Sequence, residues 1–201
     1  MIKFDSAIIL DDVVLSPELS SIYDQYVALS KIGKVGENHT RLADFRRWQI
    51  AYQLMIKSTN HLDIGCGVGQ FANLLKKNNS QCNVAACDVS RSWRLQNIFG
   101  FKYFDFDLKN SLDEIYDTVS CLEVIEHIEN DFDNAVLNLK KIVGKQLLLS
   151  VPFSEKLPLG PGHFQVFTKQ RLEKLFPNSK YYFCLNKNIC QWVLIDWRPA
   201  I

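Results

Sequence analysis

The sequence predicts an α/β fold with a mostly parallel sheet, helices on both faces and an antiparallel hairpin at the C-terminus. From residue 60 onward, short apolar runs alternate with amphipathic runs, which is typical of repeated βαβ units. The last two β-rich runs, 180–185 and 189–197, are separated only by Asn186-Lys187-Asn188. Because this link is too short for a crossover helix, the two strands must pair antiparallel.

The segment 1–58 precedes this alternation and contains two expected helices. Residues 1–10 fit either a short strand or an unattached arm. Ser16 followed by Pro17 is a typical helix start, and apolar residues continue at helical spacing through Leu29. After a glycine-containing loop, a second helix is expected over about residues 40–56.

The strongest local motif follows at the end of an apolar run. Asp63 is followed by Gly65, Gly67 and Gly69 at alternate positions and then by an amphipathic run over 71–77. This pattern predicts a strand, a tight turn and a helix. Glycines allow positive φ and close approach of a ligand, and a helix N-terminus presents free N–H groups. Asp63 lies where a strand meets a loop, the usual place for ligand contacts in an open α/β sheet.

The remaining elements follow the same alternation. We expect further strands at 83–87, 103–106, 118–122 and 146–151, and further helices at 90–99, 131–143 and 168–176.

Composition and charge exclude several classes of protein. With 201 residues, 47% of them hydrophobic and 22% charged, the chain is typical of one soluble globular domain. A net charge of +1 gives no electrostatic reason to expect nucleic acid or an anionic membrane as partner. No apolar run approaches the roughly 20 residues of a membrane span, and no signal peptide is recognisable. The six cysteines contain no Cys-x-x-Cys pair, which favours free thiols in the cytoplasm.

The pattern from Asp63 to Gly69 resembles motif I of the class I S-adenosylmethionine (SAM)-dependent methyltransferases. A terminal antiparallel hairpin on an otherwise parallel sheet resembles the Rossmann-like, seven-stranded fold of that family. The resemblance implies SAM as cofactor, with residues 1–58 as a helical cap and 59–201 as the SAM-binding core. One competitor is a dinucleotide-binding variant, because residues 67–72 also fit Gly-x-Gly-x-x-Ala. Such a domain would continue with another crossover in place of the hairpin.

The acid at the end of the second core strand is the expected ribose ligand. Asp88 lies about 20 positions beyond the glycine turn, the spacing of ribose-binding acids in Rossmann-like sites. In the family an acid after the third strand contacts adenine; Asp105 and Asp107 both qualify, with Asp105 preferred, and Trp93 fits either an adenine-stacking or a structural role. The predicted cofactor-binding residues are Asp63, Gly65, Cys66, Gly67, Gly69, Asp88, Val89, Asp105, Phe106, Leu122 and Glu123.

The segment 119–128 resembles the stretch after strand four of ubiquinone-type, small-molecule, glycan and small-RNA O-methyltransferases. If residues 123–128 open a helix, Glu123, Glu126 and His127 share one face. His127 is then a candidate general base for the acceptor hydroxyl. The alternative, which we do not favour, is a divalent metal held by Glu123, Glu126, His127 and His163. The isolated His39 and His61 are assigned no role.

The leading hypothesis is SAM-dependent methyl transfer to a hydroxyl oxygen of a small molecule or glycan. The alternatives are a metal-dependent RNA 2′-O-methyltransferase, a non-catalytic SAM-binding protein and a nicotinamide oxidoreductase. The first is weakened by the near-neutral charge, and the last depends only on the overlap at residues 67–72. The sequence carries no indication of the oligomeric state.

Overall fold

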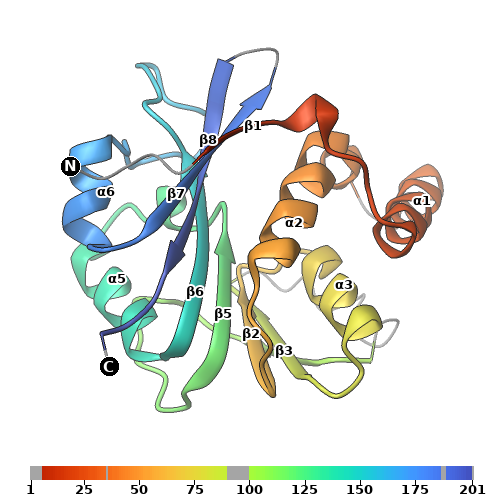
Figure 1. The fold of residues 1–201 in the computed structure, drawn as a ribbon, viewed down its shortest axis with the longest axis horizontal. Coiled ribbons are helices and arrows are strands. Elements are labelled where there is room, and N and C mark those ends of the chain that lie inside the picture. The colour runs from red at the N-terminus through yellow and green to blue at the C-terminus, as the bar shows by residue number, and fades with distance from the viewer. Residues whose placement is uncertain (1–5, 35, 90–99, 187–188, 201) are drawn as a thin grey trace.

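The computed structural model describes residues 6–34, 36–89, 100–186 and 189–200. In these residues one sheet runs through the molecule, with strand order β1-β7-β8-β6-β5-β2-β3-β4 (Figure 1). The strands are β1 (Ser6–Ile9), β2 (Asn60–Ile64), β3 (Asn83–Asp88), β4 (Lys102–Asp105), β5 (Tyr116–Leu122), β6 (Val143–Pro152), β7 (Lys180–Asn186) and β8 (Ile189–Trp197).

The topology confirms the predicted α/β class. All neighbouring strands pair in parallel except β8, which is antiparallel to both β6 and β7. The expected number of seven strands is corrected, because the sheet of the described residues has eight. The extra strand is β1, which pairs in parallel with β7 at the outer edge, so residues 6–9 form a strand and are not an unattached arm.

Helices cover both faces of the sheet (Figure 1). The helices α1 (Pro17–Lys31), α2 (Leu42–Leu54) and α3 (Gln70–Asn78) lie on one face, and α5 (Phe132–Lys141) and α6 (Lys169–Leu175) lie on the other. Short 3₁₀ turns occur at Leu10–Asp12, Glu37–Thr40 and Ile125–His127. The helix expected at 90–99 lies outside the described residues.

Two helices begin with a side-chain cap. The hydroxyl of Ser16 accepts a hydrogen bond from the Leu19 N–H, and Thr168 accepts one from the Arg171 N–H. Each cap pairs one of the N–H groups that a helix N-terminus leaves free. No helix in the described part of the chain is both long and apolar enough to cross a membrane.

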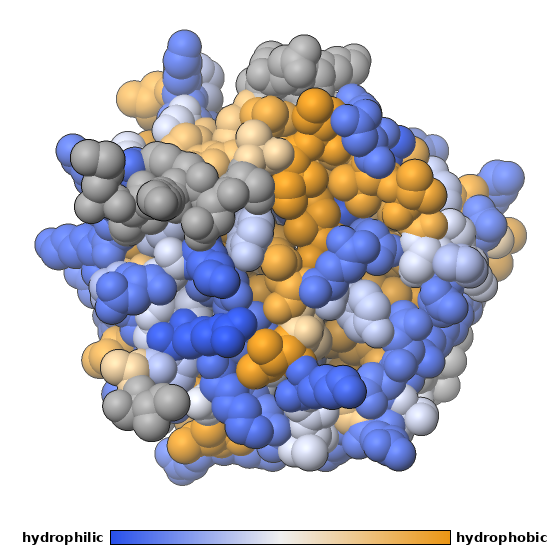
Figure 2. Space-filling model, in the orientation of Figure 1, coloured by the Kyte–Doolittle hydropathy of each residue, from blue (hydrophilic) through white to orange (hydrophobic). Residues whose placement is uncertain are grey.

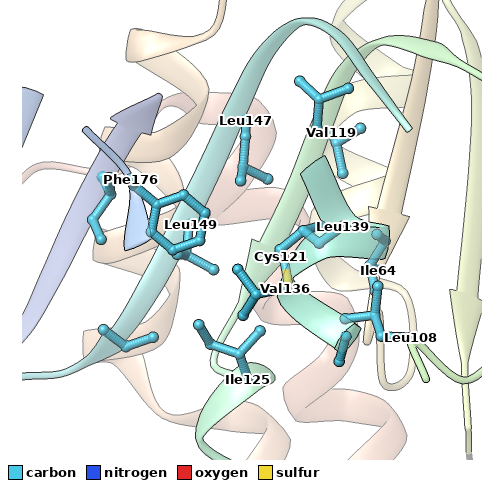
Figure 3. Packing of buried hydrophobic residues seen from close by; sticks show 14 of the residues in the cluster. Ile64, Leu108, Val119, Cys121, Ile125, Val136, Leu139, Leu147, Leu149 and Phe176 are labelled. Carbon is cyan, nitrogen blue, oxygen red and sulfur yellow. The ribbon is translucent and has the colours of Figure 1, made fainter. Parts of the chain in front are cut away.

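The core has one layer on each side of the sheet. Leu139 and Val136 of α5 pack on Leu149, Val119 and Cys121 of the central strands (Figure 3). The other layer lies under α1, α2 and α3. Figure 2 shows that apolar residues gather in the middle of one face of the molecule, where Figure 1 places α2 next to the sheet. All six cysteines are free, and all but Cys190 are buried.

Replacing Leu139 by alanine should destabilise the fold, because Leu139 is fully buried on α5. We expect the free energy of unfolding to fall by about 2–5 kcal/mol in urea titrations. Leu137→Ala is the matched control, since Leu137 lies on the same helix with 51% of its surface exposed. The control should change stability by about 0.5 kcal/mol or less. Equal losses in both variants would contradict this description of the core.

Candidate functional site

A cavity of about 400 Å³ lies beside the carboxyl ends of β2, β3 and β5. Its position is the one expected for a ligand in an open α/β sheet. The lining residues are Ile64, Gly65, Asp88, Val89, Phe106, Asp107, Leu108, Lys109, Glu123, Val124, His127 and Ile128. The cavity therefore brings together the glycine turn, the acid of the second core strand and the segment that follows β5.

The glycine turn has a backbone that side chains would not tolerate. Gly65, Gly67 and Gly69 all have positive φ, with angles of 65°, 55° and 83°. A Cβ at Gly65 would lie 2.3 Å from a methyl carbon of Val124, so the turn and the segment after β5 can approach closely only because Gly65 has no side chain. A Cβ at Gly67 would meet no atom of the described residues within 4 Å, so this part of the turn faces open space.

Asp88 holds the turn from the neighbouring strand. Its Oδ2 accepts a hydrogen bond of 2.8 Å from the Gly67 N–H, and its carboxylate lines the cavity. Val89, which follows it, is 70% exposed and also lines the cavity. The second core strand thus places a carboxylate and an apolar side chain at the cavity wall.

The other predicted cofactor residues divide into two groups. Phe106 and Glu123 line the cavity together with Gly65. Asp107 also lines it, whereas the preferred Asp105 is an exposed residue of β4 and does not. The predicted residues that lie outside the lining are Asp63, Cys66, Gly67, Gly69, Asp105 and Leu122.

Asp63 lies buried beneath the turn and is only 3% exposed. Its Oδ1 accepts a hydrogen bond of 2.6 Å from the Ser120 hydroxyl of β5. Burial raises the pKa of the Asp63 carboxyl to about 7, because removal from water disfavours the charged form. The carboxyl group therefore changes its charge near neutral pH.

The expected helix at 123–128 is wrong. Glu123 has a φ of 61°, and only a 3₁₀ turn, Ile125–His127, follows it. The side chains of Glu123 and Glu126 consequently do not share one helical face. Glu123 accepts a hydrogen bond from the Ser150 hydroxyl, and its other oxygen lies 3.4 Å from the Arg47 guanidinium.

Arg47 is a residue that the sequence reading missed. It comes from α2, is 2% exposed, and stacks over the Trp192 ring at 4.7 Å. It also forms an ion pair of 3.1 Å with Asp44. A buried arginine on a helix has no sequence signal apart from its position on the apolar face. In the structure it links the N-terminal helices to Glu123 at the cavity.

His127 and His163 meet at the edge of the cavity. The His127 Nδ1 lies 2.9 Å from the Gly162 carbonyl oxygen, so it carries the proton and donates it, which leaves Nε2 with its lone pair. The two imidazole rings lie 4.9 Å apart. Backbone bonding holds this arrangement, because the Phe164 N–H donates to the Glu126 carbonyl oxygen.

Glu126 lies below these two histidines and is fully buried. Among the described residues neither of its carboxyl oxygens has a hydrogen-bond partner. Burial, together with the nearby Glu123 carboxylate, raises the pKa of Glu126 to about 9. Ligand atoms of Glu126, His127 and His163 lie within 4.8 Å of one another, and Glu123 is not part of this group. The four-ligand arrangement considered from the sequence is therefore reduced to three residues.

Comparisons with known proteins point to one family. A family model described as a methyltransferase domain matches residues 32–182. A ubiquinone biosynthesis O-methyltransferase from Rickettsia conorii is 36% identical over 88 residues, which cover 40% of this chain and 29% of the relative. The matched part is thus less than a third of that relative's length.

Two solved structures have a similar fold. Magnesium protoporphyrin IX methyltransferase from Synechocystis PCC 6803, with bound S-adenosylhomocysteine (SAH), aligns with a TM-score of 0.61 and 17% identity over 90% of this chain and 95% of that chain. The 1,6-didemethyltoxoflavin-N1-methyltransferase from Burkholderia thailandensis aligns with a TM-score of 0.63 and 16% identity, over 94% and 92% of the two chains.

The raised pKa of Glu126 predicts a pH-dependent stability. At a pH below the usual carboxyl pKa, the protonated Glu126 makes its full contribution to the stability of the folded state. This contribution is lost as the pH rises toward about 9. Glu126→Gln has no titrating carboxyl group. Between pH 5 and pH 9 its free energy of unfolding should therefore fall by about 2–5 kcal/mol less than that of the wild type. Urea unfolding at both pH values measures the difference. Glu129→Gln, at an exposed position, should follow the wild type; parallel curves for all three proteins would contradict the buried state of Glu126.

Proposed function

The chain belongs to the class I SAM-dependent methyltransferases, and we propose that it transfers the methyl group of SAM to a hydroxyl oxygen of a small molecule or sugar. One observation carries the proposal: a single cavity of about 400 Å³ is lined by Asp88 at the cofactor motif and by His127 after β5. This volume lies within the usual range for small-molecule sites. The names of similar proteins include an O-methyltransferase and an N1-methyltransferase, so the acceptor atom is part of the proposal.

The residues around the glycine turn fit SAM. The Asp88 carboxylate can accept hydrogen bonds from ribose hydroxyls while it holds the Gly67 N–H. We propose Asp107 for the adenine contact, because it lines the cavity and Asp105 does not. Open space at Gly67 leaves room for the ligand beside the backbone. When bound, SAM supplies an activated sulfonium methyl group.

His127 is the proposed general base. The Gly162 carbonyl oxygen fixes the proton on Nδ1, so Nε2 is free to accept the proton of an acceptor hydroxyl. Because the methyl group needs little covalent assistance, the main task of the protein is to align the acceptor and exclude water. The 3₁₀ turn and the backbone bond from Phe164 hold His127 at the cavity.

A metal-dependent version is the second candidate, and the cluster at His127 favours it. Glu126, His127 and His163 combine two imidazoles with a carboxylate that has no hydrogen-bond partner among the described residues, a donor set that suits Mn²⁺ or softer divalent ions. These three residues would hold the ion, which would supply acidification of the acceptor hydroxyl. We favour the metal-free version because His163 already pairs with Glu155 at 2.8 Å.

The N-terminal segment 1–58 is the proposed cap on the core 59–201. Two contacts to the glycine turn and its helix support this role. The Tyr26 hydroxyl of α1 donates to the Val68 carbonyl oxygen, and the Gln70 amide donates to the His39 carbonyl oxygen. The six free thiols support a reducing compartment such as the cytoplasm. The net charge of +1 provides no support for a nucleic-acid acceptor.

Calorimetry should detect binding of SAH and no binding of NAD. Asp88→Ala should weaken SAH binding by about 10- to 150-fold, because a charge-assisted contact contributes roughly 1.5–3 kcal/mol. Asp113→Ala, at an exposed position outside the cavity, is the control and should bind as the wild type does. Binding of NAD without binding of SAH would refute the cofactor assignment for this chain.

Mutation of His127 should separate the two mechanisms. Mass spectrometry of hydroxylated small molecules and glycans incubated with SAM identifies a working acceptor. With that acceptor, His127→Ala should lower kcat by about 10²- to 10⁴-fold while the Kd of SAH is unchanged. We expect full activity in EDTA and in His163→Ala. Loss of activity in both, with restoration by Mn²⁺ after EDTA, would select the metal-dependent version.

A further inference from the structure

A chain of buried polar side chains runs along β2 and β5 toward Asp63. The Ser120 hydroxyl lies 2.6 Å from Asp63 Oδ1 and 2.9 Å from the Nε2 of His61. The Nδ1 of His61 lies 2.8 Å from the Thr118 hydroxyl, which lies 2.9 Å from the hydroxyl of Ser58. The register of the strands creates this chain, because His61 pairs with Thr118 and Asp63 pairs with Ser120.

The chain leads from Asp63, beneath the glycine turn, to a second cavity. This cavity, of about 270 Å³, lies at the other end of β2 and is lined by Ser58 and His61 among others. Ser58 is half-buried, whereas His61, Thr118 and Ser120 are almost completely buried. The hydrogen bonds therefore extend from the rim of one cavity, through the core, to the carboxyl group beneath the glycine turn.

The chain has two complete hydrogen-bonding arrangements. Burial lowers the pKa of His61 to about 3, so the ring is neutral and carries one proton. When Asp63 is ionised, Ser120 donates to it, His61 donates from Nε2 to Ser120, and Thr118 donates to Nδ1. When Asp63 is protonated, Asp63 donates to Ser120, Ser120 donates to Nε2 of His61, and Nδ1 of His61 donates to Thr118. Thr118 can then donate to Ser58. The charge of Asp63 is thus linked to the tautomer of His61.

In the part of the chain that the structure describes, no positively charged side chain perturbs the pKa of Asp63. The Asp88 carboxylate raises the pKa of Asp63, and Asp63 in turn raises the pKa values of the Cys66, Cys87 and Cys121 thiols and of the Tyr26 hydroxyl, so these are the titratable groups around it. Among the described residues none of these groups is a cation. A buried carboxylate without a counter-charge favours a cationic ligand, and SAM carries an ammonium group.

We propose that Ser120 and His61 are positioning residues for Asp63, and that their chain carries away the proton that Asp63 releases when SAM binds. The inference rests on the proposed function. The proton balance is complete: Asp63 gives a proton to Ser120, Ser120 gives one to Nε2 of His61, Nδ1 gives one to Thr118, and Thr118 gives one to Ser58. One proton leaves at the second cavity, and Asp63 becomes the counter-ion of the bound ammonium.

The experiment is calorimetry of SAH binding between pH 5.5 and 8.5, in buffers that differ in ionisation enthalpy. The wild type should release about half a proton per SAH at pH 7, because Asp63 is then about half ionised. The Kd should rise by up to about tenfold per pH unit below pH 7. Asp63→Asn should lose this release, which distinguishes the proton of Asp63 from protons released by the groups that line the cavity.

Variants of the chain test the positioning role. Ser120→Ala removes a bond that favours the ionised carboxylate, so the midpoint of the pH profile should move up by about one to two pH units. Binding should then approach that of the wild type at pH 8.5. His61→Leu should move the midpoint in the same direction. Ser120→Thr keeps the hydroxyl and should restore the wild-type profile.

The outcomes separate this inference from the proposed function. If SAH does not bind at any pH, the proposed function fails. If SAH binds with no proton release and a flat pH profile in the wild type, only the relay is refuted. A loss of affinity in Ser120→Ala that is equal at all pH values also overturns the relay, because a purely structural role has that effect. The wild-type measurement stands even where a variant does not fold.

Discussion

The parallel pairing of β2 with β3 and with β5 is the constraint on which the site depends. Because the three strands run in the same direction, their carboxyl ends meet at one edge of the sheet. Asp63, Asp88 and Glu123 are far apart in the sequence, yet each lies at or just beyond one of these ends. The glycine turn then adds a second constraint. Its positive φ angles let the backbone approach Val124 and Asp88, so that the motif of β2 and the segment after β5 border one cavity.

Two buried acids at this edge of the sheet have raised pKa values. Asp63 and Glu126 are both almost completely buried, and burial raises the pKa of each. A core selected for stability alone would have apolar side chains at these positions, because the desolvation free energy of a buried charge exceeds its electrostatic stabilisation unless the charge is paired. Glu123, in contrast, has a cation beside it in Arg47. The two acids with raised pKa values thus lie where the methyl donor and acceptor are proposed to bind, and the acid beside Arg47 lies where the proposed cap meets the core.

Local chemistry decided which parts of this structure could be predicted from the sequence. The turn after Asp63 was predictable because glycines at alternate positions have few other uses, and the terminal hairpin because the link at 186–188 is short. The 3₁₀ turn after Glu123 was not, because Glu123 has a positive φ, which is uncommon for residues other than glycine and has no signal in the sequence. Arg47 and His61 were missed for a related reason. Their neighbours, Glu123 and Ser120, come from β5 and its following loop, and no spacing within the sequence reveals such a contact.

The strand β1 has a consequence for the surface of the protein. It pairs with β7, so the sheet of the described residues ends on β1 at one side and on β4 at the other, and each of these strands has four residues. Without β1, the seven-residue β7 would present its unpaired N–H and C=O groups at the edge. A long open edge is a template for pairing with another chain, whereas a short one is a poor template. Residues 6–9 thus protect the fold against edge-to-edge aggregation, although they lie far along the sheet from the cavity.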